Sequence, residues 1–75
     1  MTMAEMRERY RQMFDEAEGA RQATCYSMIV GVLGEAGTPL DAKNSIHAYE
    51  VVSAEDAAKI FQTARYELER MAREA

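Results

Sequence analysis

Three times along this chain, a hydroxyl residue is followed three positions later by a carboxylate. The pairs are Thr2 with Glu5, Thr38 with Asp41, and Ser53 with Asp56. In such a pair the hydroxyl accepts a hydrogen bond from a free N–H group of the first helical turn, and the carboxylate reaches back to the cap. The sequence therefore predicts an all-α fold whose helices begin directly after residues 2, 38 and 53.

The first segment has the spacing of a helix with one apolar face. From Met3 onward, apolar and small residues recur at alternating intervals of three and four, which is a heptad pattern. From Cys25 to Leu33 almost no polar side chain remains, as expected of a helix that is buried on all sides. Gly19 costs about 1 kcal/mol relative to alanine inside a helix, but no capping residue follows it. We therefore predict one long helix from Met3 to Leu33, with a bend allowed at Gly19.

The second segment follows a glycine-rich stop at residues 34–37. Thr38 caps it, and Pro39 stands at the first helical position, where its missing N–H does no harm. Residues 46–52 fit either a helix or a short strand that pairs across a dimer axis. Because a lone strand needs a partner, we predict a short helix to about Ala48 and then an extended connector through Val51 and Val52.

The third segment runs from Ala54 to about Glu74. Its apolar stripe, with Phe61 near the middle, steps by four and three and so matches the first helix in period. We expect these two helices to pack antiparallel at the shallow angle of a bundle. The chain is then a single helical domain that spans residues 1–75.

The length of the predicted first helix favours a homodimer. It would extend roughly 45 Å at 1.5 Å per residue, whereas a compact chain of 75 residues has a radius of gyration near 11 Å. Either Gly19 folds the helix back, or a second copy covers the protruding part. One cysteine allows no internal disulfide, so oligomerisation remains the available source of stability. We predict a shared dimer core of Tyr26, Ile29, Val30 and Leu33.

Charge and composition restrict the partners and the compartment. A net charge of −4 argues against binding to nucleic acids or to anionic membranes, which need a basic surface. The first residues read as a capped helix and not as a signal peptide. The longest apolar stretch is much shorter than the roughly 20 residues that span a bilayer. We therefore expect a cytoplasmic protein whose Cys25 stays reduced.

Catalytic, cofactor and metal sites lack the residues that they need. Cys25 and His47 lie on different segments, and no third residue stands ready to orient them. His47 and Glu50 are spaced for one helix face, but two ligands do not make a metal site. Glycines 31, 34 and 37 end a helix, whereas a phosphate-binding loop joins a strand to one. We expect a protein that is not an enzyme and that uses no cofactor or metal.

A methionine-rich stripe near the N-terminus is the candidate partner surface. Methionine side chains adapt to varied partners because they are flexible and polarizable. The stripe consists of Met3, Met6, Tyr10, Met13 and Phe14. We predict a non-enzymatic helical module for protein–protein interaction, either an adaptor or an inhibitor of the kind that a phage or mobile element directs at a host system.

Two other functions fit the same residues. The first is binding of a small ligand, a nucleotide or a metabolite, in a pocket at the dimer interface lined by Tyr26, His47, Tyr49 and Arg65. The second is an acidic neutraliser of the antitoxin type, which the net charge of −4 suits. The sequence itself does not choose among these partners.

Overall fold

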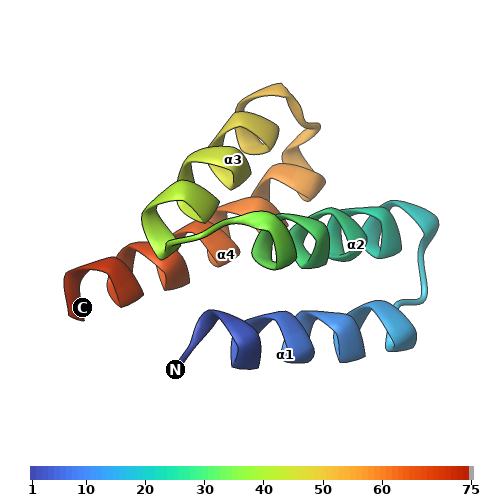
Figure 1. The fold of residues 1–75 in the computed structure, drawn as a ribbon. Helices are drawn as coiled ribbons and strands as arrows, with labels where there is room; N and C mark the ends of the chain where they lie inside the picture. The colour runs from blue at the N-terminus through green and yellow to red at the C-terminus, as the bar shows by residue number, and fades with distance from the viewer. Residues whose placement is uncertain (75) are drawn as a thin grey trace.

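In the computed structural model, which describes residues 1–74, the chain forms four α-helices (Figure 1). They are α1 (Met3–Glu16), α2 (Ala20–Glu35), α3 (Pro39–Val52) and α4 (Glu55–Glu74). Residues 1–74 contain no strand, so the predicted all-α class is confirmed and a strand at residues 46–52 is excluded.

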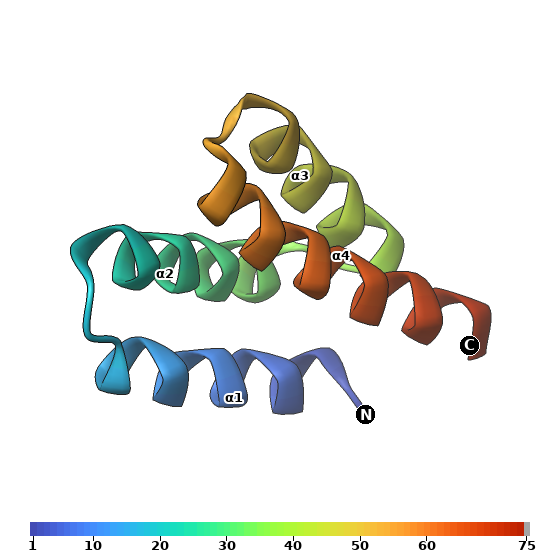
Figure 2. The ribbon, with the colours of Figure 1, turned by 180° about the vertical axis from the view of Figure 1, so that it is seen from behind.

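The helices are arranged as two hairpins that pack on each other. α1 packs against α2, and α3 packs against α4. Figures 1 and 2 show α1 and α3 at opposite sides of the molecule, with α2 and α4 between them. α2 also contacts α3 and α4, so it has neighbours on several sides.

The prediction of one long N-terminal helix was wrong. α1 ends at Glu16, and α2 begins after Gly19, which has an extended backbone with φ −111° and ψ 147°. The Gly19 carbonyl accepts the first hydrogen bond of α2, from the N–H of Ala23 at 2.9 Å. Tertiary burial explains the break, because folding back at residues 17–19 places the apolar face of α1 over the apolar face of α2.

This fold-back removes the length argument for a second copy. The radius of gyration is 11.3 Å and the longest dimension is 34 Å, which is the compactness expected of a single chain of this size. Three members of the predicted dimer core, Tyr26, Ile29 and Leu33, are buried inside one chain, and Val30 is half-buried. Covering these residues therefore does not require a partner.

Two of the three predicted caps are present. Thr2 and Glu5 form a complete capping box, with bonds of 2.8 and 3.1 Å, and the Thr38 hydroxyl accepts from the N–H of Asp41 at 3.1 Å. Ser53 instead donates its hydroxyl to the carbonyl of Tyr49 at 2.6 Å. It therefore terminates α3 rather than capping α4.

The middle helix is longer than predicted, and the extended connector at Val51 and Val52 was a wrong prediction. α3 continues to Val52 because Ala42 and Ile46 are buried at a spacing of four residues, and Glu50 extends this spacing toward α4. The polar residues between them face outward and do not interrupt the helix.

The buried core draws on all four helices. Its largest fully buried side chains are Met6, Ile29, Ile46, Phe61 and Leu68. The expected packing of the last helix on the first segment is present only as a contact of α4 with α2, and the main neighbour of α4 is α3. α1 reaches α4 through side chains, among them the ion pair of Arg9 with Glu67.

Phe61→Ala should lower the free energy of unfolding by about 3–5 kcal/mol, because it leaves a cavity in the core to which all four helices contribute. Tyr66→Ala is the matched control, since Tyr66 lies on the same helix with about half of its surface exposed. Chemical denaturation of both variants would measure the difference. Equal small losses in the two variants would contradict the position of Phe61 at the centre of the core.

Candidate functional site

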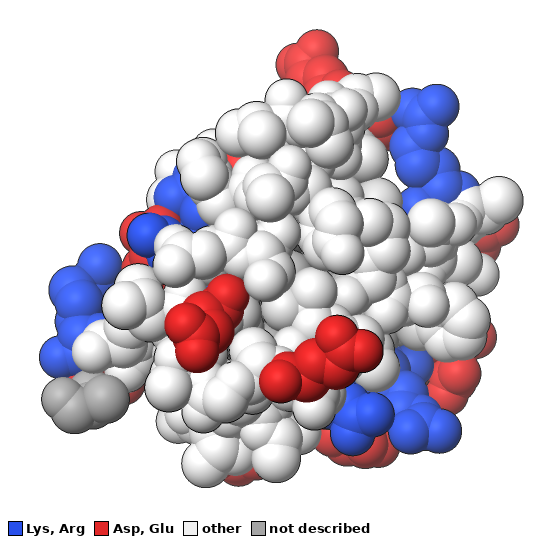
Figure 3. Space-filling model, turned by 45° about the horizontal axis from the view of Figure 1, so that its top comes forward, with Lys and Arg blue, Asp and Glu red and all other residues white. Residues whose placement is uncertain are grey.

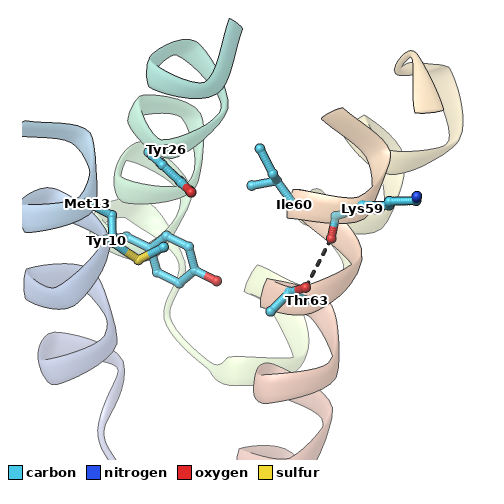
Figure 4. Close-up of a pocket in the computed structure, with 6 residues that line it drawn as sticks. All are labelled: Tyr10, Met13, Tyr26, Lys59, Ile60 and Thr63. Atoms are coloured by element: carbon cyan, nitrogen blue, oxygen red, sulfur yellow. Dashed lines mark hydrogen bonds between the residues drawn. The ribbon is translucent and has the colours of Figure 1, made fainter. Parts of the chain in front are cut away.

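A groove of about 300 Å³ opens between α1, α2 and α4 (Figure 4). Its lining comes from three helices: Tyr10, Met13, Tyr26, Lys59, Ile60 and Thr63. The fold-back at Gly19 creates this groove, because it brings the tyrosines of α1 and α2 to the same place opposite α4.

The two tyrosines define one wall of the groove. Their ring centroids lie 5.9 Å apart in a tilted arrangement. Figure 4 shows both hydroxyls directed into the space in front of Ile60 and Thr63, while the Lys59 side chain leads away from it. The Tyr26 hydroxyl accepts a bond from Gln22 Nε2 at 3.2 Å, which leaves its own proton available for donation. The groove is therefore an apolar surface that carries phenol hydroxyls and no inward-pointing cation.

Burial keeps the Tyr10 phenol neutral over a wide pH range. Loss of solvent raises the pKa of Tyr10 to about 12; the nearby Glu67 carboxylate acts in the same direction, and Arg9 partly opposes them. A neutral phenol both donates and accepts hydrogen bonds. At physiological pH the wall can therefore bind a neutral polar group, but it does not attract an anion.

A polar cluster centred on Arg65 joins α3 to α4. Arg65 donates from Nε to Glu50 Oε1 at 2.6 Å and from a terminal nitrogen to Glu50 Oε2 at 3.3 Å, and it also bonds Glu69 at 2.6 Å. The bonds from Arg65 lower the pKa of Glu50, and His47 contributes from 3.5 Å. Both carboxylates in this cluster are bonded to Arg65, so we assign the cluster to positioning the two helices rather than to catalysis.

The four residues of the predicted ligand pocket do not line one cavity within the chain. His47 and Arg65 meet at Glu50. Tyr49 packs on Phe61 with ring centroids 5.7 Å apart, and Tyr26 lines the groove beside α1. A pocket that combines them across two copies stays an untested prediction.

The predicted partner stripe on α1 mostly faces the core. Met6 and Tyr10 are buried, and Met3 and Met13 are half-buried. Only Phe14 is exposed, with 41% of its surface accessible, and it does not line the groove. The prediction that the whole stripe is a free surface was wrong. Heptad spacing shows that a helix face is packed, but it does not show whether the packing partner is the same chain or another protein.

An uncharged face on α3 and the neighbouring part of α2 was missed. Between residues 22 and 49 the only Asp, Glu, Lys or Arg residues are Glu35, Asp41 and Lys43, so the signal was present in the sequence. Figure 3 shows this side as a largely uncharged surface, with acidic groups in its lower part and charged groups of both signs at its margins. On α3, Leu40 and Val51 are more than half exposed.

The thiol and the possible metal ligands are dispersed. Cys25 is buried, and burial raises the pKa of its thiol, so it is a poor nucleophile. Within residues 1–74, His, Cys, Asp and Glu nowhere gather in a group of three that could hold a metal ion. None of the described helices is long and apolar enough to cross a membrane. Comparisons with protein-family models, curated proteins and solved structures find no match.

Tyr10 should make stability depend on pH in the alkaline range. Its pKa is about 12 in the folded chain and near 10.0 in the absence of burial. The folded state thus retains a proton that the unfolded state releases, so the stabilisation is complete below pH 10 and is lost between pH 10 and about 12. Denaturation at several pH values should show a smaller alkaline loss in Tyr10→Phe than in the wild type. Tyr66→Phe is the control, and an unchanged slope in Tyr10→Phe would refute the assignment.

Arg65→Met should cost about 1–2 kcal/mol near neutral pH, because it leaves the mostly buried Glu50 carboxylate without its main partner. Arg70→Met is the control, since Arg70 is an exposed arginine of the same helix. Arg65 lowers the pKa of Glu50 below 4.5, so the stabilisation is present above pH 4.5 and is lost as the pH falls below it. Urea denaturation at neutral and acidic pH measures both effects, and a difference that persists in acid would contradict the role of this pair.

Proposed function

We propose that the chain is a non-enzymatic protein–protein interaction module that receives an apolar side chain of another protein in the groove. The observation that carries the proposal is the composition of this groove, in which Tyr10, Met13, Tyr26 and Ile60 come together from three helices. Tyrosine and methionine are enriched at protein interfaces, and the residues that dominate binding energy sit in desolvated pockets of this kind.

The size and charge of the groove favour a side chain over a nucleotide. Its volume of about 300 Å³ is at the lower end of the range for drug-sized ligands. A phosphate group needs a cation or a set of free N–H groups, whereas Lys59 leads away from the groove. An aliphatic or aromatic side chain needs neither.

The proposal covers several biological roles. An adaptor, a phage-type or mobile-element inhibitor of a host system, and an acidic antitoxin-like neutraliser would all act through such a surface. The net charge of −4 suits a partner with a basic surface around the apolar contact, because complementary charges accelerate association.

A small apolar metabolite is the second candidate occupant. The directed hydroxyls of Tyr10 and Tyr26 favour it, because they could orient a carbonyl or hydroxyl group of such a ligand. A ligand of this kind should raise the melting temperature when it is the only molecule added to the chain.

Filling the groove should abolish partner binding. Thr63 is exposed at the groove wall, so Thr63→Arg should block the groove without disturbing the core. Ser27→Arg places the same charge on an exposed position of α2 outside the lining. We expect a protein captured from an extract of the source cells by the wild type and by Ser27→Arg to bind Thr63→Arg at least about 30-fold more weakly.

Quantitative mass spectrometry of the three captures identifies the partner, and titration with the purified partner gives the affinities. A thermal-shift screen of small molecules on wild type and Thr63→Arg tests the metabolite. If every captured protein binds all three chains equally and no small molecule shifts the wild type alone, the groove is not the binding site.

A further inference from the structure

We propose that α3 pairs antiparallel with α3 of a second copy of the chain, across a two-fold axis. This surface lies on the side of the molecule away from α1 and from the groove (Figures 1 and 2). The pairing goes beyond the proposed function and does not depend on it.

The first support is the exposure of large aliphatic side chains along one helix. Leu40 is 54% exposed, Val51 is 65% exposed and Val52 is 81% exposed. Single exposed aliphatic residues are common on monomers, but those of α3 stand among exposed positions of which Asp41 is the only charged one. Figure 3 shows a largely uncharged face on this side, with acidic groups in its lower part.

The second support is the order of residues along the exposed strip of α3. Leu40, Asn44, His47 and Val51 follow one another at intervals of four, three and four residues, and all are exposed. This order is apolar, polar, polar, apolar. An antiparallel copy therefore places Leu40 opposite the second copy's Val51 at both ends, and Asn44 opposite its His47 in the middle. A symmetric interface requires this kind of self-complementarity.

The third support is electrostatic. Glu50 is mostly buried and already bonded to Arg65, so Asp41 is the one exposed charged residue of α3. The antiparallel arrangement places the two copies of Asp41 at opposite ends of the pair, so these like charges do not meet across the strip. The macrodipoles of the two helices also oppose each other, which is the favourable orientation.

The size of the surface predicts a weak dimer. A helix of 14 residues is about 21 Å long. A contact along such a helix buries less than the roughly 800 Å² per partner of a stable, standard-size interface. We therefore expect a monomer at nanomolar concentration and a dimer at high micromolar concentration.

Paired charge substitutions test both the surface and its register. Leu40→Lys and Val51→Glu should each weaken self-association at least about tenfold, because each places two charges against aliphatic side chains. The double variant L40K/V51E should restore it, because the two introduced charges then lie opposite each other at both ends. Phe14→Glu is the control, since Phe14 is an exposed apolar residue on α1.

Sedimentation velocity from 5 µM to about 1 mM provides the measurement. A concentration-dependent dimer that the single variants weaken at least about tenfold, and that the double variant recovers, supports the proposal. Recovery also shows that the substituted chains fold. A wild type that stays monomeric at about 1 mM would overturn the proposal. So would a dimer that Val51→Glu leaves unchanged, or one that the double variant fails to restore.

Discussion

Burial of α2 is the constraint on which the rest of the structure depends. This helix buries Cys25, Tyr26, Ile29 and Leu33, and neighbouring positions are half-buried. Such a helix needs partners on several sides, since one neighbouring helix covers only a single stripe. The chain provides α1 by reversing direction at residues 17–19 and then provides α3 and α4 from the other hairpin. The groove beside Tyr26 is the place where α1 and α4, on either side of α2, do not close completely.

The parts of the fold that local chemistry determines could be predicted from the sequence. Thr2 and Thr38 cap their helices as expected, and α4 has nearly the predicted bounds. The break at Gly19 could not be predicted, because a glycine weakens a helix by only about 1 kcal/mol while burying a single large side chain is worth more. Ser53 failed as a cap for a similar reason, since its hydroxyl can bond equally well to the preceding helix.

Only parts of the candidate site could be predicted from the sequence. Spacing selected Tyr10 and Met13 correctly as members of one face of α1, but it assigned that face to a partner. The spacing of apolar residues along a helix does not show whether the apolar face packs within its own chain or against another chain. Ile60 and Thr63 join these residues only through the packing of the two hairpins, which no local pattern encodes. The uncharged face was visible in the sequence as a long interval with few charges, but only its first part, Cys25 to Leu33, was interpreted, as a buried dimer core.

The two proposed surfaces together have a consequence that neither has alone. The groove lies beside α1, while the α3 strip lies on the opposite side of α2 and α4. A two-fold dimer through α3 would therefore leave both grooves accessible at its outer sides. Two grooves on one particle can engage a multimeric partner at two points, and the second contact then forms at a high effective concentration. A small groove and a weak dimer would in this way combine to give tight binding, and binding of the bivalent partner would in turn stabilise the dimer.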